Sequence, residues 1–116
     1  MQGHDRVELT VDSIDGVLAV SVRGALVGDA GEPLAQCLSQ AIRGGRPVVV
    51  DLTATSAIDR RGIDLLMDAN RALATRLRLV VERGGDVHQE LRREGVAHVL
   101  SLHGSRPEAL TASRPR

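Results

Sequence analysis

The run RPVVVDLTAT at residues 46–55 constrains the fold more than any other part of the sequence. Three consecutive valines give the segment no polar side, which is typical of a strand buried on both faces in a parallel arrangement. Parallel strands need long crossover connections, and segments with helical spacing precede and follow this run. We therefore predict a central parallel strand in an α/β domain.

Strand and helix patterns alternate along the rest of the chain. Strands at 6–12 and 16–24 are separated by SIDG, in which Asp15-Gly16 suits a tight hairpin turn. The order ββαβαβαβ predicts a mixed central sheet of about five strands flanked by three to four helices. The other predicted elements are helices at 32–45, 62–76 and 86–95 and strands at 77–82 and 97–102. A single domain is expected at 1–104, and 105–116 is expected to be a tail with one helical turn at 107–110 before a disordered end.

The predicted helices carry recognisable boundary and core residues. Pro33 fits the first turn of one helix and Gly44 its left-handed exit, while Asp86 is expected to cap the last helix and Gly95 to end it. Cys37 falls on an apolar stripe, so we interpret it as a small core residue rather than a reactive thiol. The stripes are predicted at Leu34, Cys37, Leu38, Ala41 and Ile42, and at Leu65, Leu66, Ala69, Ala72 and Leu73.

Composition excludes several classes of function. Acidic and basic residues balance at 15 each, so no net positive charge attracts nucleic acid. The chain has no Phe, Tyr or Trp, so it also lacks the aromatic side chains on which bases stack. No apolar run approaches the roughly 20 residues that span a bilayer, and the polar start MQGHDRVELT does not resemble a signal peptide. With a single cysteine, these features favour a cytoplasmic protein without direct membrane insertion.

Motifs for catalysis and metal binding are missing from the sequence. It contains no phosphate-binding Gly-Lys loop, no nucleophile elbow and no His-Glu-x-x-His helix, and its four histidines lack metal-ligand spacing. We expect no metal and no cofactor. Asp51, Asp59 and Asp64 fall near loop ends, where carboxylates sometimes hold a cation, but Asp59 is better explained as a helix N-cap and Asp51 as the polar end of a strand.

Two arginines stand where a helix least favours positive charge. Arg60 and Arg61 fall at the start of the helix that follows the central strand, where unpaired N–H groups carry partial positive charge. One reading is that they make charge-assisted contacts with acidic residues of a partner; the other is that both side chains extend into solvent.

The run VVVDLTATSAIDRRGIDLL resembles the STAS domain family of bacterial anti-sigma factor antagonists. Members carry an apolar strand ending in Asp-Leu, then a hydrophobic-Asp-Ser-Ser/Thr-Gly-Leu corner that opens a helix. Here the matching positions are Asp51-Leu52, Ile58-Asp59, Gly62-Ile63 and Leu65-Leu66. VRGAL at 22–26 resembles the family's Gly-Glu-Leu-Asp stretch, and the resemblance extends from about Val7 to Leu102. It implies a non-enzymatic domain that docks onto a partner.

The departures from this pattern bear on regulation. The resemblance places Arg60 at the serine that the anti-sigma factor kinase phosphorylates, with Arg61 at the following Ser or Thr; Ala25 and Val27 stand where the family often has Glu and Asp. A guanidinium cannot be phosphorylated and does not mimic phosphoserine, so we expect no switching at the usual site. Other hydroxyls remain in the same loop, namely Thr53, Thr55 and Ser56.

An apolar pair next to the arginines suggests a docking surface. Ile63 and Met67 are one turn apart and fall beside the predicted core stripe, so we expect them to be partly exposed, with the charges of Asp64 and Asp68 around them. The other reading is that a neighbouring loop covers them. The predicted partner-binding residues are Asp59, Arg60, Arg61, Gly62, Ile63, Asp64 and Met67.

Two functions therefore remain open at the level of sequence. The first is a regulatory domain that binds a kinase-type anti-sigma factor or a protein of a signalling complex. The second is an accessory or ligand-sensing domain of a transporter or lipid-trafficking complex, in which the arginines would attract a nucleotide or a lipid headgroup. The sequence leaves homodimerisation open.

Overall fold

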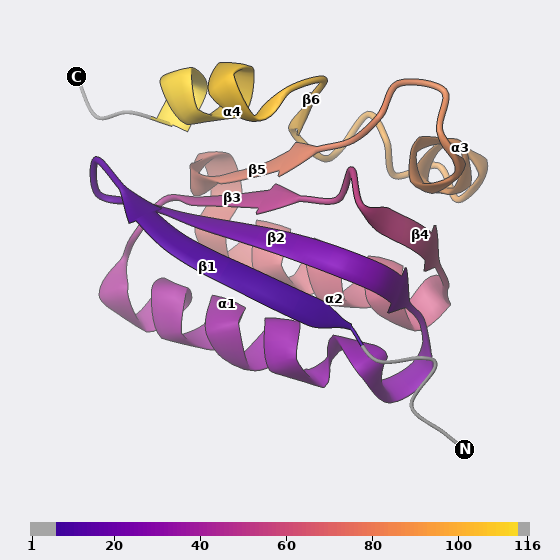
Figure 1. Ribbon diagram of the computed structural model, residues 1–116, viewed down its shortest axis with the longest axis horizontal. Coiled ribbons are helices and arrows are strands. Elements are labelled where there is room, and N and C mark those ends of the chain that lie inside the picture. Colours follow the sequence, from indigo (N-terminus) through magenta and orange to yellow (C-terminus); the bar gives the residue numbers. More distant parts are fainter. Residues whose placement is uncertain (1–6, 114–116) are drawn as a thin grey trace.

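A six-stranded mixed sheet organises the protein, as Figure 1 shows. The structure is a computed structural model, and it describes residues 7–113. The strands are β1 (Glu8–Ile14), β2 (Val17–Leu26), β3 (Val48–Asp51), β4 (Thr55–Ile58), β5 (Leu77–Val80) and β6 (Leu102–His103). The helices are α1 (Glu32–Gly44), α2 (Arg60–Leu73), α3 (Asp86–Arg93) and α4 (Arg106–Ser113), with short 3-10 helices η1 (Gly28–Gly31) and η2 (Ala74–Arg76).

The sheet has the order β1-β2-β3-β5-β6, and β4 pairs with β2. β1 and β2 are antiparallel, whereas β3 pairs in parallel with β2 and with β5. The predicted α/β architecture with a central parallel strand is therefore confirmed. The hairpin prediction is also confirmed, since Asp15 (φ 53°) and Gly16 (φ 82°) both adopt the left-handed conformation that a two-residue hairpin turn requires.

The helices cover the two faces of the sheet unequally. α1 and α2 lie side by side on one face, and the main core fills the space between them and the sheet (Figure 1). α4 lies on the opposite face, where Ala109 packs with Val17, Val49 and Val80. None of the helices within residues 7–113 has the length and hydrophobicity of a membrane-spanning segment.

One strand was missed and one was misplaced. The segment 55–58, predicted as loop, forms β4 against the second half of β2, and the buried Thr55 hydroxyl donates to the carbonyl of Val22 at 2.8 Å. The predicted strand at 97–102 is wrong over most of its length. Gly95 (φ 75°) ends α3 as predicted, but the Val96 carbonyl then accepts from the N–H groups of Val99 and Leu100, which makes a turn. Only Leu102–His103 form a strand.

Several predicted helix boundaries also need correction. α1 exits through Gly45 (φ 68°), while Gly44 is its last helical residue. Gly85, not Asp86, is the N-cap of α3, and no side chain caps that helix. The predicted turn at 107–110 is part of α4, which continues to Ser113 and packs against the sheet through Ala109. Residues 114–116, predicted to be disordered, lie outside the described residues.

Candidate functional site

The corner that opens α2 is held by the carboxylate of Asp59. One oxygen accepts from the N–H of Gly62 at 3.0 Å, as an N-cap does, and the other accepts from the N–H of Gly28 at 2.8 Å. The hydrogen bonds from Gly28 and Gly62 hold the pKa of Asp59 below its ordinary value. The N-cap prediction is confirmed, and the carboxylate also ties α2 to the segment between β2 and α1.

Gly62 is required by close packing. A Cβ atom at this position would lie 2.6 Å from the Leu26 carbonyl oxygen and 2.8 Å from Cγ1 of Ile58. The first turn of α2 therefore rests directly on the end of β2. Gly62 is buried and shapes the corner from beneath, so it offers no side chain or free surface to a partner.

The two arginines lie on the surface and pair with acidic side chains of the same chain. Arg60 is 74% exposed and lies 3.2 Å from Glu94, at the end of α3, and 3.6 Å from Asp64. Arg61 is 66% exposed and lies 2.7 Å from Asp29 of η1. These carboxylates offset the charge of the arginines at the helix N-terminus. Neither arginine simply extends into solvent, and neither is enclosed.

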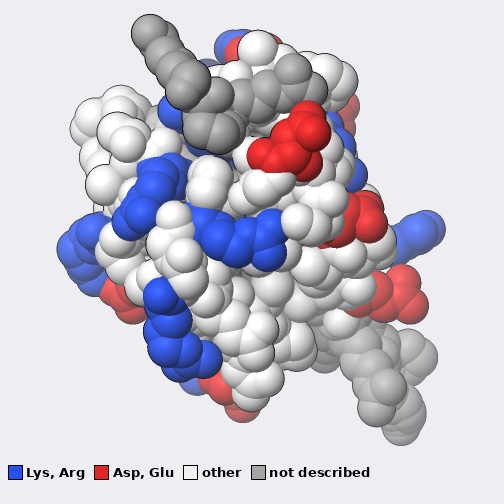
Figure 2. All heavy atoms as spheres, turned by 90° about the vertical axis from the view of Figure 1, so that its left-hand side faces the viewer, with Lys and Arg blue, Asp and Glu red and all other residues white. Residues whose placement is uncertain are grey.

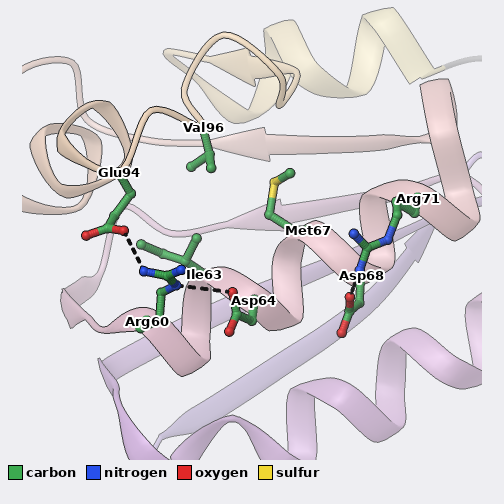
Figure 3. Close-up of a pocket in the computed structure, with 8 residues that line it drawn as sticks. All are labelled: Arg60, Ile63, Asp64, Met67, Asp68, Arg71, Glu94 and Val96. Carbon is green, nitrogen blue, oxygen red and sulfur yellow. Dashed lines mark hydrogen bonds and ion pairs between the residues drawn. The ribbon is translucent and has the colours of Figure 1, made fainter.

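A groove runs beside Arg60 between α2 and the segment that follows α3 (Figure 3). Its volume is about 470 Å³. Met67 and Val96 are half-buried and supply apolar surface, and ion pairs of Arg60 and of Arg71 lie along the rim. The lining residues are Arg60, Ile63, Asp64, Met67, Asp68, Arg71, Glu94 and Val96.

The predicted exposure of Ile63 is wrong. Ile63 is only 2% exposed and belongs to the main core, whereas Leu65 is half-buried and Ala72 is exposed. α2 packs against both the sheet and α1, and Leu65 turns toward α1, where it lines a second, smaller groove. Because α2 contacts two neighbouring elements, its buried residues cover more of the helix surface than a single apolar stripe. Met67 is partly exposed, as predicted.

The other candidate residues do separate structural jobs. Asp51 accepts from the backbone and hydroxyl of Thr53 and pairs with Arg106 at 3.4 Å, which fixes the start of α4. Within residues 7–113, no three His, Cys, Asp or Glu side chains gather as metal ligands would. Of the loop hydroxyls, Thr55 is buried, while Thr53 and Ser56 are exposed.

A second charged surface lies at the far end of α1 and α2, where Figure 2 shows arginine side chains gathering. Arg76 donates to the carbonyls of Gly45 and Leu73, and Arg46 donates to the hydroxyl of Ser13 at 2.6 Å. Cations are favourable at helix C-termini, so helix capping accounts for Arg76, while Arg46 ties the end of α1 to β1.

Three residues of the groove, Arg71, Glu94 and Val96, were not predicted, whereas Asp68 was expected as a charge beside Met67. Glu94 and Val96 come from beyond α3, more than 30 positions after Arg60. The available signal was the left-handed Gly95 between them, which ends α3 and carries the chain past α2.

The fold is that of a small α/β domain, and residues 8–109 match the STAS domain. The chain belongs to the STAS domain family. A comparison with curated proteins finds no match.

Solved structures of anti-sigma factor antagonists share the fold. The protein is similar to one from Mycobacterium paratuberculosis, with 24% identity, a TM-score of 0.86 and coverage of 96% of this chain and 97% of that chain. The phosphorylated form of the Bacillus cell fate determinant SpoIIAA matches with 17% identity, a TM-score of 0.68 and coverage of 92% and 100%. A STAS domain protein from Planctomyces limnophilus matches with 17% identity, a TM-score of 0.67 and coverage of 90% and 96%.

Proposed function

We propose that this STAS domain is a bacterial, cytoplasmic regulatory protein without enzymatic activity that binds a kinase-type anti-sigma factor or a protein of a signalling complex. The observation that carries the proposal is the exposed corner of α2, with Arg60 beside a groove that combines apolar and charged side chains, on a fold shared with anti-sigma factor antagonists. The binding surface consists of Arg60, Arg61, Asp64 and Met67, with Asp59, Gly62 and Ile63 supporting it from below.

The surface has the composition of a small docking site. Met67 and Val96 offer half-buried apolar contact, and the charges of Arg60, Asp64 and Glu94 stand around them. An apolar side chain of the partner fits the groove, and a partner carboxylate beside it pairs with Arg60. Apolar anchors within a charged rim are typical of protein interfaces.

The same geometry argues against control by a kinase at the usual position. The resemblance places the phosphorylated serine of the family at Arg60, a residue without a hydroxyl. Phosphoserine at that point would add nearly two negative charges beside Asp64 and Glu94, whereas Arg60 keeps a permanent positive charge there. Phosphorylation at this position is therefore lost, and Thr53 and Ser56 are the exposed hydroxyls that remain in the loop.

The test is the affinity for a kinase-type anti-sigma factor from the same genome, measured by titration calorimetry. Arg60→Glu and Met67→Asp should each weaken binding at least about tenfold, because each removes an anchor. Arg43→Glu changes an equally charged, exposed residue at the other end of the molecule and should bind like the wild type. Undiminished binding by both Arg60→Glu and Met67→Asp, with thermal unfolding unchanged, would exclude this surface.

The alternative of a nucleotide or lipid headgroup at the α2 N-terminus gains no support from the contacts around it. The carboxylate of Asp59 already accepts a hydrogen bond from the N–H of Gly62. The guanidinium groups of Arg60 and Arg61 already pair with carboxylates of the same chain. An added phosphate would meet these carboxylates as well as the arginines. A partner carboxylate at Arg60 would also face Asp64 and Glu94, but it brings one negative charge, whereas a terminal phosphate brings nearly two.

A further inference from the structure

The free edge of the sheet is formed by β1. Among the described residues, β1 pairs with β2 alone, and Figure 1 shows it at the margin of the sheet. An edge strand presents unpaired backbone N–H and C=O groups that another strand readily completes. Natural proteins often protect such edges with proline, bulges or charged side chains. β1 has no proline and no bulge, since its pairing with β2 is regular over all seven residues, ELTVDSI, but it carries the carboxylates of Glu8 and Asp12.

The hairpin determines which backbone groups point outward. Asp15 and Gly16 form a two-residue turn, so the flanking pair Ile14 and Val17 exchanges hydrogen bonds, and pairing alternates from there. The N–H and C=O groups of Leu9, Val11 and Ser13 therefore point away from β2. The free edge offers three residues in register, with Val11 in the middle.

Val11 is also unusual in its exposure. It is 47% exposed, and the other exposed large apolar side chain in the described part of the chain is Val99, at 49%. Val11 lies opposite Val20, a core residue under the helical layer, so its side chain stands on the helix-covered side of the sheet but beyond the cover. A strand added at this edge would bury it.

We propose that two copies of this chain pair through β1 in an antiparallel arrangement, with a twofold axis at Val11. The pairing joins the two sheets into one, and Val11 packs against its symmetry mate. Leu9, Val11 and Ser13 exchange backbone hydrogen bonds with Ser13, Val11 and Leu9 of the second copy. This register uses the full length of the strand, because Val11 is the central residue of Glu8–Ile14.

Charge selects the same register. With the axis at Val11, Asp12 faces Thr10 of the second copy and Glu8 faces Ile14. An axis at Thr10 would place Glu8 opposite Asp12, and an axis at Asp12 would place two Asp12 carboxylates opposite each other, which is destabilising. An axis between two residues would pair side chains from opposite faces and put the two helical layers on opposite sides. The Val11 axis avoids all three conflicts.

Sedimentation equilibrium of the full chain over a concentration series tests the proposal. The wild type should dimerise, and Val11→Lys should raise the dimer dissociation constant at least about tenfold, since it removes the central apolar contact and places like charges together. Val99→Lys is the matched control, because it changes an equally exposed valine elsewhere, and it should dimerise like the wild type. A monomeric wild type, or equal effects of the two substitutions, would overturn the proposal.

A cross-link gives a second readout that does not depend on affinity. In a Cys37→Ser background, Val11→Cys should form a disulfide-linked dimer on mild oxidation, because residues in a hydrogen-bonded antiparallel pair have Cα atoms about 5.5 Å apart. Val99→Cys in the same background should cross-link far less; equal cross-linking would count against the twofold axis. Circular dichroism confirms that each variant is folded.

The proposed dimer and the proposed function can be tested independently of each other. β1 and the corner of α2 share no residue, so Val11→Lys should leave binding of the anti-sigma factor unchanged. Arg60→Glu should likewise leave the dimer dissociation constant unchanged. A dependence of one on the other would show that the two surfaces overlap, against the arrangement proposed.

Discussion

The guanidinium of Arg60 lies 3.2 Å from the carboxylate of Glu94, and this ion pair joins the first turn of α2 to the end of α3. Because Arg60 is 74% exposed, solvent screens the attraction, and we expect Glu94→Gln to lower the free energy of unfolding by less than about 1 kcal/mol. Urea denaturation of Glu94→Gln, Arg60→Gln and the double variant would measure the coupling. Arg92→Gln on the same helix is the control, and a coupling that persists in high salt would contradict a screened pair.

The same substitution should strengthen binding. In the proposed complex Glu94 would compete with a partner carboxylate for Arg60, so Glu94→Gln should tighten binding of the anti-sigma factor by about threefold or more, as removal of a competing charge does. Calorimetry with Glu94→Gln and with Arg60→Gln/Glu94→Gln would measure this. The gain should vanish when Arg60 is absent; a gain that survives would mean that Glu94 acts on something else.

Asp59 should make stability depend on pH under acidic conditions. Its pKa is lowered by hydrogen bonds from Gly28 and Gly62, so the carboxylate favours the folded state. Its stabilisation is fully present above the unfolded pKa of about 3.9 and is lost as pH falls through the lower folded pKa. Asp59→Ala should therefore cost about 1 kcal/mol at neutral pH, as loss of an N-cap does, and progressively less below about pH 4.

Urea denaturation of the wild type and of Asp59→Ala, repeated from neutral to acidic pH, would measure this pH dependence of the free energy of unfolding. Glu82→Ala provides the comparison, since Glu82 is exposed and lies outside β1 and the corner of α2. A cost for Asp59→Ala that stays constant down to the most acidic pH would contradict the assignment.

Gly62→Ala should destabilise the protein even though alanine favours helices. The new Cβ would lie 2.6 Å from the backbone oxygen of Leu26, which has little freedom to move. We expect a net loss of about 1–3 kcal/mol, as for overpacked cores. Thermal unfolding of Gly62→Ala beside Gly44→Ala is the measurement. Gly44 is helical with its nearest neighbour at 3.8 Å, so alanine should fit there without loss.

Substitutions of Ile63 and Met67 should affect the free energy of unfolding and partner binding differently. Ile63→Ala should lower the free energy of unfolding by about 2–4 kcal/mol, because the side chain is 2% exposed in the main core. Met67→Ala should cost clearly less, because Met67 is half-buried beside the groove, but should weaken partner binding. Urea denaturation with calorimetry distinguishes the two. Equal losses of stability would show that Met67 is as much a core residue as Ile63.

Local chemistry was sufficient to predict the hairpin, the parallel central strand and the cap at Asp59. Each depends on residues close in the sequence: the left-handed pair Asp15-Gly16, the valines 48–50, and a carboxylate three residues before Gly62. The order of elements followed, apart from β4, the two-residue β6 in place of the strand predicted at 97–102, and the helix α4 in place of a single turn.

Tertiary contacts determined what the sequence could not predict. TSAI at 55–58 becomes a strand only because the end of β2 is long enough to pair with it. The burial of Ile63 in place of Leu65 depends on α2 having two neighbours, and the groove needs α3 to end beside α2. No pattern within any one of these segments specifies the contact.

The ten-residue strand β2 pairs with β3 over its first half and with β4 over its second. The polypeptide therefore enters α2 from a hydrogen-bonded strand rather than from a free loop. Little conformational entropy is left to lose at this corner when a partner binds, so more of the contact energy remains as affinity. Because the segment before Arg60 is already ordered, we expect a partner to associate with a preformed surface, without local folding upon binding.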